Sequence, residues 1–195
     1  NQLEILSVHG FYDEGPEYPM TLNKLIEQTI KVGAKNILIS FFKKQALLTN
    51  SKKVKARNQL IESLKKATKL NLWLAVETEM PAPELKTFID SFGQLNIGVY
   101  YDIGNMASMN VNLADDIYFL GKLIRCVHIK DRLKNGDGSV PLGEGDTDFK
   151  ESFTALKANG YNGPYIIQGA RKEGMGDEKL NAQYLSFVKN LIAKI

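Results

Sequence analysis

Short apolar segments and longer amphipathic segments alternate along the whole chain, and this alternation limits the possible folds more than any other feature. Each apolar segment has four to six residues and is rich in Ile, Leu, Val or Tyr, which is typical of strands buried on both faces of a parallel sheet. Strict alternation of such strands with helices predicts an α/β fold. The expected strands are Leu3–Val8, Asn36–Phe41, Leu72–Glu77, Ile97–Asp102, Ile124–Ile129 and Tyr165–Gln168.

The amphipathic segments carry the marks of helices. Thr21 and Asp148 are expected N-caps, and Gly33 and Gly160 stand where two helices should stop. Six βα units that recur every 25–40 residues or so indicate a (β/α)8 TIM barrel, of which only six units are visible. We expect one domain over residues 1–195. The expected helices lie at about 21–33, 60–67, 83–93, 113–123, 148–160 and 178–192.

Composition narrows the possible partners. The chain has 195 residues, of which 44% are hydrophobic and 24% charged, as in an ordinary globular domain. No apolar run approaches the roughly 18 residues that a membrane-spanning helix needs, so no membrane contact is expected. The formal net charge of +3 is spread along the sequence, so we expect no nucleic-acid partner.

The cysteine content and the first residue bear on the compartment. Cys126 is the one cysteine, so an internal disulfide is excluded and a buried, inert thiol in a reducing cytoplasm is expected. The chain starts at Asn1 without a methionine, and its first residues read as the start of a strand. We therefore expect a trimmed N-terminus, and a lost targeting segment stays open.

Polar side chains stand at or near the ends of four consecutive expected strands. They are Glu77, Asp102, His128 and Gln168, at spacings of 25, 26 and 40 residues. In a barrel the carboxyl ends of the strands meet at the active site. Two carboxylates, an imidazole and an amide suit one divalent ion, Mn²⁺, Mg²⁺, Co²⁺ or Zn²⁺. The alternative is that they are unrelated polar residues at strand ends.

The segments around these residues carry a family resemblance over nearly the whole chain. The chain resembles the L-ribulose-5-phosphate 3-epimerase group and sequences named hexulose-6-phosphate isomerase, in the xylose-isomerase-like barrel superfamily. Aligned by these motifs, it lacks the first two βα units. The motifs are Val-Glu77, Tyr-Asp102-Ile-Gly-Asn105, Val-His128-Ile-Lys130-Asp131, Val-Pro141-Leu-Gly-Glu144-Gly-Asp-Thr-Asp-Phe149 and Gly163-Pro164-Tyr-Ile-Ile.

The resemblance implies roles for the strand-end residues. Glu77, Asp102 and His128 would be metal ligands, and Gln168 stands where the family has a fourth ligand, a glutamate. In such enzymes the metal chelates the carbonyl and adjacent hydroxyl of a ketose, and two glutamates move a proton through an enediolate. The expected activity is therefore a metal-dependent isomerase or epimerase acting on a pentulose or hexulose phosphate, with Glu77 and Gln168 in the catalytic positions.

Gln168 weakens this expectation. A carboxamide oxygen still binds a hard cation but brings no negative charge, and it cannot act as a general base. Loss of one acid–base group typically costs about 10²–10⁴ in rate. Three accounts compete: natural loss of two-base epimerisation, an engineered inactivation, or chemistry that needs one base. The neighbouring Gly169-Ala170-Arg171 also departs from the family, which favours natural divergence.

Five further residues are candidates for substrate binding. Lys130, Arg132 and Arg171 lie in two glycine-containing loops after the last strands, where such barrels bind phosphate, although solvated loop charges would look the same. His9 ends the first expected strand and is either substrate-facing or structural. Asn105 either hydrogen-bonds a sugar hydroxyl or caps the following helix.

Rival interpretations remain open. The chain could be a catalytically inactive relative that binds a sugar or serves as an oligomeric scaffold. An abasic-site endonuclease needs several metals and histidines, and the chain has only His9 and His128. An open six-strand barrel would expose two sheet edges, so either the chain is a fragment, or another subunit or a rearranged terminus covers the gap. We therefore expect edges screened by helix or paired between copies of a homo-oligomer.

Overall fold

The computed structural model describes residues 3–134, 136 and 138–195. It contains a six-stranded sheet in the order β1-β2-β3-β4-β5-β8 and a separate two-stranded sheet of β6 and β7. The chain divides into two compact units, Asn1–Tyr100 and Tyr101–Ile195, and the boundary falls inside strand β4. The pairs β1–β2, β2–β3, β3–β4 and β5–β8 are all parallel, as the alternating pattern predicted.

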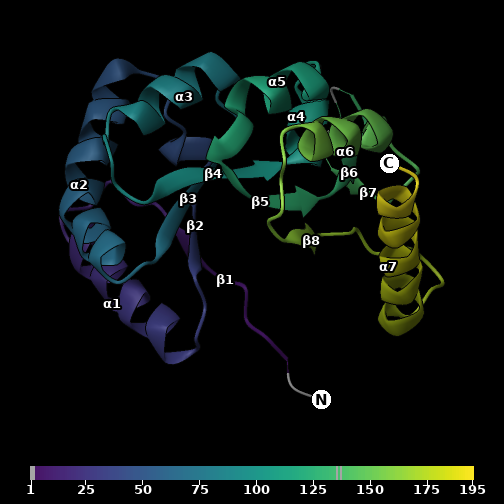
Figure 1. Ribbon diagram of the computed structural model, residues 1–195, viewed down its shortest axis with the longest axis horizontal. Helices are drawn as coiled ribbons and strands as arrows, with labels where there is room; N and C mark the ends of the chain where they lie inside the picture. Colours follow the sequence, from purple (N-terminus) through teal and green to yellow (C-terminus); the bar gives the residue numbers. More distant parts are fainter. Residues whose placement is uncertain (1–2, 135, 137) are drawn as a thin grey trace. The chain divides into compact units, whose positions relative to one another are not determined.

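The first unit alternates strands with helices. Figure 1 shows the α-helices of this unit along one side of its strands. Leu25 of α1 packs on Gly10 of β1, where a Cβ would lie 2.5 Å from Leu25 Cδ2. Its elements are β1 (Ser7–Phe11), α1 (Tyr18–Lys31), β2 (Asn36–Phe41), a 3-10 turn (Lys43–Gln45), α2 (Asn50–Lys69), β3 (Trp73–Thr78), α3 (Ala82–Asp90) and β4 (Ile97–Asp102).

The second unit contains helices packed on one another, the parallel strand pair β5–β8 and the antiparallel pair β6–β7. Helix α5 packs on α6 and α6 on α7, and Phe153 of α6 stacks on Tyr165 of β8 at 5.0 Å. The Cys126 thiol is buried as expected, and this burial raises its pKa to about 12. The elements are α4 (Ile103–Ser108), α5 (Leu113–Leu120), a 3-10 turn (Gly121–Leu123), β5 (Ile124–Ile129), β6 (Asp131–Arg132), β7 (Ser139–Val140), α6 (Phe149–Ala158), β8 (Tyr165–Ile167) and α7 (Asp177–Ala193).

The N-terminal expectations need correction. The first strand is Ser7–Phe11 rather than Leu3–Val8, so His9 lies in its middle and does not end it. The prediction was wrong because it took apolar Leu3 as part of a buried strand, whereas Leu3 is 92% exposed. The first helix begins at Tyr18 with a proline in its first turn, and Thr21 donates to the Glu17 carbonyl instead of capping.

Other expectations hold with small changes. Gly33 and Gly160 follow their helices in the left-handed region, at φ +75° and +69°, and the Asp148 side chain accepts from the backbone N–H of Glu151 as an N-cap. The last strand ends at Ile167, one residue earlier than predicted. The short helix α4 and the β6–β7 pair were not predicted. In the part of the chain that the structure describes, no helix is long and apolar enough to span a bilayer.

The core of the first unit predicts a large cost for one truncation. Phe41 of β2 is fully buried and contacts the rings of Tyr12 and Phe88, with centroids 4.6 and 6.3 Å away. We expect Phe41→Ala to lower the free energy of unfolding by about 3–5 kcal/mol, because it leaves a cavity. Val54→Ala on the exposed face of α2 should change it by less than about 0.5 kcal/mol. Urea unfolding of both variants measures this, and equal losses would contradict the assigned core.

Candidate functional site

Three neighbouring strands of the first unit bring polar side chains together. Ser40 of β2 lies opposite Glu77 of β3 in the parallel ladder, and its hydroxyl donates to Glu77 Oε2 at 2.7 Å. His9 of β1 lies opposite Leu38, two residues before Ser40, so its side chain points to the same face. Its Nε2 is 2.8 Å from Ser40 Oγ. Glu77 and Ser40 are buried, and His9 is exposed.

The second unit holds a buried cluster around Asp102. The Asp102 carboxylate is 3% exposed, with Oδ2 3.1 Å from Lys130 Nζ and 3.7 Å from His128 Nδ1. Its Oδ1 accepts the backbone N–H of Asn105 at 2.8 Å and so caps α4. Burial alone would raise the pKa of Asp102, but the facing His128 ring, the Lys130 ammonium and this N–H together lower it.

Asn105 joins the cations to this cluster. Its side-chain oxygen accepts from Lys130 Nζ at 3.4 Å and from an Arg132 guanidinium nitrogen at 3.1 Å. The alternative that Asn105 caps the following helix is wrong, because Asp102 caps α4 and Asn112 caps α5. Beside it, a Cβ on Gly104 would lie 2.6 Å from the Lys130 carbonyl oxygen, so only glycine allows this close approach.

The remaining predicted residues follow β8. The backbone N–H of Gln168 donates to the carbonyl of Ile129 at 2.9 Å, which extends the β5–β8 pairing, and the Gln168 residue is exposed. Arg171 has an 89% exposed side chain and pairs at 3.7 Å with Asp177 at the start of α7. Arg171 therefore belongs to the exposed loop before α7, whereas Lys130 and Arg132 both contact the side-chain oxygen of Asn105.

Two residues of this region were missed by sequence reasoning. Ser40 gives no motif signal, because its contact depends on strand register. Asp131 is fully buried and accepts three backbone N–H groups, from Gly143 and Gly145 at 2.8 and 2.9 Å and from Thr147 at 3.2 Å. The glycine-rich motif after Pro141 is the available signal. Asp131 organises this loop by accepting its backbone N–H groups.

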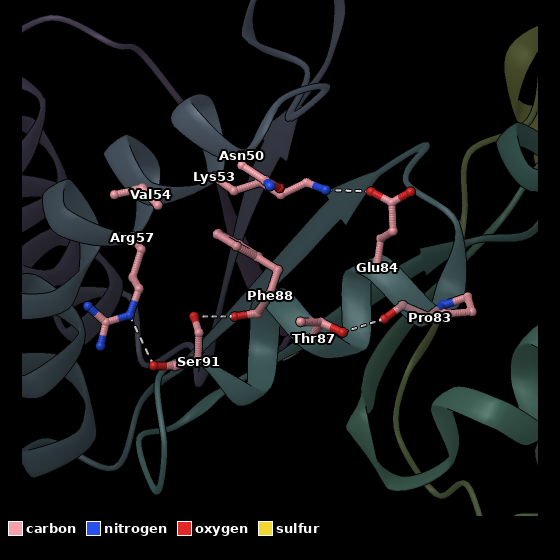
Figure 2. A pocket seen from close by; sticks show the side chains of 9 residues that line it. All are labelled: Asn50, Lys53, Val54, Arg57, Pro83, Glu84, Thr87, Phe88 and Ser91. Carbon is pink, nitrogen blue, oxygen red and sulfur yellow. Dashed lines mark hydrogen bonds and ion pairs between the residues drawn. The ribbon is translucent and has the colours of Figure 1, made fainter.

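A cavity of about 740 Å³ lies elsewhere in the first unit, between α2 and α3. Figure 2 shows that Lys53 on its wall pairs with Glu84, while Arg57 Nε donates to the carbonyl of Ser91 at 3.0 Å. The Arg57 guanidinium also lies over the Phe92 ring, 5.8 Å from its centroid. The residues that line this cavity include none of the predicted site residues, and its cations are already engaged.

The donor set of the second unit fits a divalent ion. Among the described residues, buried Asp102 Oδ2 forms an ion pair with Lys130 Nζ at 3.1 Å but accepts no hydrogen bond, whereas buried polar atoms normally have one. Two ligands that each lie about 2.0–2.2 Å from an ion can be up to roughly 4.4 Å apart, and Asp102 Oδ2 and His128 Nδ1 are within that range at 3.7 Å. A carboxylate oxygen and an imidazole nitrogen are ligands that Zn²⁺ and Mn²⁺ accept.

Comparison with known sequences gives a consistent result. A family model described as a xylose isomerase-like TIM barrel matches residues 21–191. The chain is 31% identical over 126 residues to an L-ribulose-5-phosphate 3-epimerase UlaE of Escherichia coli O157:H7, a match that covers 61% of this chain and 44% of that protein. A Salmonella paratyphi A protein of the same name is 31% identical over 118 residues, covering 57% and 41%. The chain thus spans less than half the length of these curated relatives.

Solved structures share the fold. A xylose isomerase domain protein from Planctomyces limnophilus has a TM-score of 0.83 and 20% identity, covering 98% of this chain and 78% of that one. The IolI protein, whose crystal structure has a bound zinc atom, has 0.82 and 17%, with 98% and 77% coverage. An L-ribulose 3-epimerase has 0.75 and 17%, with 96% and 75% coverage. At these identities the likeness establishes the fold alone.

The three N–H groups on Asp131 predict a structural role that can be measured. In Asp131→Asn the amide NH₂ must face at least one backbone N–H, so we expect a loss of about 1–3 kcal/mol in the free energy of unfolding. Asp146→Asn in the same loop is the control, since exposed Asp146 accepts one backbone N–H, from Lys134. Amide hydrogen exchange at Gly143, Gly145 and Thr147 should accelerate only in Asp131→Asn. Unchanged protection of those amides would refute the role.

Proposed function

Because the chain belongs to the xylose isomerase-like TIM barrel family, we propose that it is a metal-dependent epimerase or isomerase of a pentulose or hexulose phosphate. The observation that carries the proposal is the buried pair Asp102 and His128 of the second unit, with Oδ2 and Nδ1 3.7 Å apart, and we propose Glu77 as the third ligand because the family resemblance implies it. Each comes from a different strand, and β3, β4 and β5 are neighbours in the sheet order. The likeness to L-ribulose-5-phosphate 3-epimerases supports the substrate class.

The proposed ligands are Glu77, Asp102 and His128, with Gln168 in the fourth place. Two carboxylates balance the charge of a divalent ion, so a neutral fourth ligand leaves no excess negative charge but also binds the ion less strongly. Asp102 is held for this role by its N-cap bond, which uses Oδ1 and leaves Oδ2 facing His128. A bound divalent ion would polarise the carbonyl of a ketose.

Glu77 is the proposed acid–base group for the proton transfers. In the proposed reaction its carboxylate takes the proton from the carbon next to the carbonyl. The C–H electron pair then forms the C=C bond, and the π pair of the carbonyl moves onto its oxygen to give an enediolate. Return of the proton from the carboxylic acid completes the step. Gln168 cannot take or give a proton. With Glu77 as the only base, proton return on the same face is the chemistry that these residues supply.

The positive groups of the second unit suit a sugar phosphate. Lys130 and Arg132 converge on the Asn105 side-chain oxygen, and we propose that they contact the substrate together with Asn105. His9, on β1, is not included in this set, because its Nε2 lies 2.8 Å from Ser40 Oγ. Arg171 is the weakest of the candidates, because it pairs with Asp177 on the exposed loop. Homo-oligomer formation, coverage of the sheet edges and a cytoplasmic location stay predictions.

A catalytically inactive relative, serving as a sugar-binding or oligomeric scaffold protein, is the alternative. Gln168 favours it, because the second acid–base group that the family resemblance implies is replaced by an amide. The two functions differ in one observable, which is exchange of the substrate proton with solvent.

Metal binding provides the first test. We expect titration with Mn²⁺, followed by electron paramagnetic resonance, to show one site per chain. Asp102→Asn and Glu77→Gln should each weaken it by at least about 10-fold, because each removes a charged ligand. Asp90→Asn, which changes an exposed carboxylate paired with Lys86, is the matched control. Equal affinity in all four proteins would contradict the site.

Proton exchange provides the second test. The protein is incubated in D₂O with Mn²⁺ and ribulose or xylulose 5-phosphate, and deuterium incorporation next to the carbonyl is followed by NMR. We expect exchange by the unmodified protein that is lost in Glu77→Gln. Gln168→Glu should exchange faster, by about 10²–10⁴ if its carboxylate restores the second base. Exchange in Gln168→Glu alone would favour the inactive relative, and exchange in neither protein, with no metal bound, would contradict the proposed enzyme.

A further inference from the structure

A one-way hydrogen-bond chain crosses the three neighbouring strands that lead to Glu77. A serine hydroxyl has one hydrogen to donate, and an ionised carboxylate can only accept. Ser40 donates to Glu77 Oε2 at 2.7 Å, so its oxygen is the acceptor for His9 Nε2 at 2.8 Å. The chain therefore runs from the His9 Nε2–H through the Ser40 hydroxyl to the Glu77 carboxylate.

The strand register builds this chain. Ser40 and Glu77 are direct partners in the β2–β3 ladder, and His9 reaches the same face from β1. The His9 ring also packs on Phe11 with centroids 4.4 Å apart, which limits its rotation. Burial increases along the chain from exposed His9 to Ser40 and Glu77, at 3% and 4% exposure. The buried carboxylate is thus held from one side by a hydroxyl whose own direction is set by the imidazole.

We propose that Ser40 is a positioning residue for Glu77 and that His9 acts on the reaction through Ser40 rather than by binding substrate. The proposal rests on the proposed function, in which Glu77 is the base. A base must face the substrate carbon in a fixed direction, and a misplacement of about 1 Å can cost 10²-fold in rate. Ser40 restrains Oε2, and His9 prevents the hydroxyl from turning away from it.

Kinetics of the metal-loaded protein separate positioning from substrate binding. We expect Ser40→Ala to lower kcat for proton exchange by about 10- to 100-fold with little change in KM. Ser40→Thr keeps the hydroxyl and should recover most of the rate. His9→Gln, whose amide nitrogen can replace Nε2–H, should also retain it, whereas His9→Ala should not. Ser63→Ala is the matched control, because Ser63 is a buried serine of the same unit whose hydroxyl donates to a backbone carbonyl, that of Pro19, at 3.3 Å.

A double-mutant cycle tests whether His9 works through Ser40. If it does, adding His9→Ala to Ser40→Ala causes no further loss, because the link is already broken. If His9 binds substrate, His9→Ala raises KM by the same factor in both backgrounds, and that result would overturn the proposal. The same cycle on the Mn²⁺ dissociation constant gives a readout that does not need turnover.

An NMR measurement tests the hydrogen-bond chain from His9 to Glu77 without requiring bound metal or substrate turnover. The protein has two histidines, so the ring nitrogens of His9 can be assigned by comparison with His9→Gln. We expect Ser40→Ala and Glu77→Gln each to move the His9 Nε2 resonance, while Ser63→Ala and Asp90→Asn leave it in place. If neither Ser40→Ala nor Glu77→Gln moves the His9 Nε2 resonance, the hydrogen-bond chain is refuted. If the unmodified protein neither binds metal nor catalyses exchange, but the His9 Nε2 resonance still shifts in both site variants, the proposed enzyme is refuted and the hydrogen-bond chain is not.

Discussion

The constraint on which the rest of the structure depends is the burial of carboxylates. Glu77, Asp102 and Asp131 are all at most 4% exposed, and a buried charge is costly unless nearby groups compensate it. Each carboxylate is compensated by different means, and each solution fixes a piece of local structure. The Ser40 hydroxyl donates a hydrogen bond to Glu77. Asp102 pairs with the Lys130 ammonium and accepts a backbone N–H from the first turn of α4. Asp131 accepts three backbone N–H groups of its loop.

The form of compensation separates the structural carboxylate from the candidate ligand. Both Asp131 oxygens accept backbone N–H groups, so the residue is fully committed to its loop. Asp102 is committed through Oδ1 only, and its Oδ2 faces a lysine and an imidazole without a hydrogen bond. One side chain thereby caps a helix and presents a candidate ligand atom. A helix that begins at the residue after the ligand holds that ligand more rigidly than a loop would.

Sequence pattern predicted most of the sheet and little of what supports the site. The strands Asn36–Phe41, Ile97–Asp102 and Ile124–Ile129 have the predicted bounds, because buried parallel strands are continuous apolar runs. The first strand was misplaced, since its core-facing signal is weaker than the exposed apolar residues before it. The family resemblance implied Glu77, Asp102 and His128. Sequence analysis did not identify Ser40 and Asp131. Their contacts depend on strand register and loop closure, which no local sequence pattern contains.

Gln168 gives the His9–Ser40–Glu77 chain its importance in the proposed reaction. With two bases on opposite faces, each carboxylate has to be correct in one protonation state only, since one removes the proton and the other supplies it. With an amide in the second place, Glu77 must both take the proton and return it. Its orientation must then survive a change from carboxylate to carboxylic acid. Ser40 can hold both states without turning, because its hydroxyl donates to Oε2 of the carboxylate and can donate to the same oxygen of the acid when Oε1 carries the proton. A same-face proton transfer by one well-held base follows from this set of residues more directly than inversion of a stereocentre does.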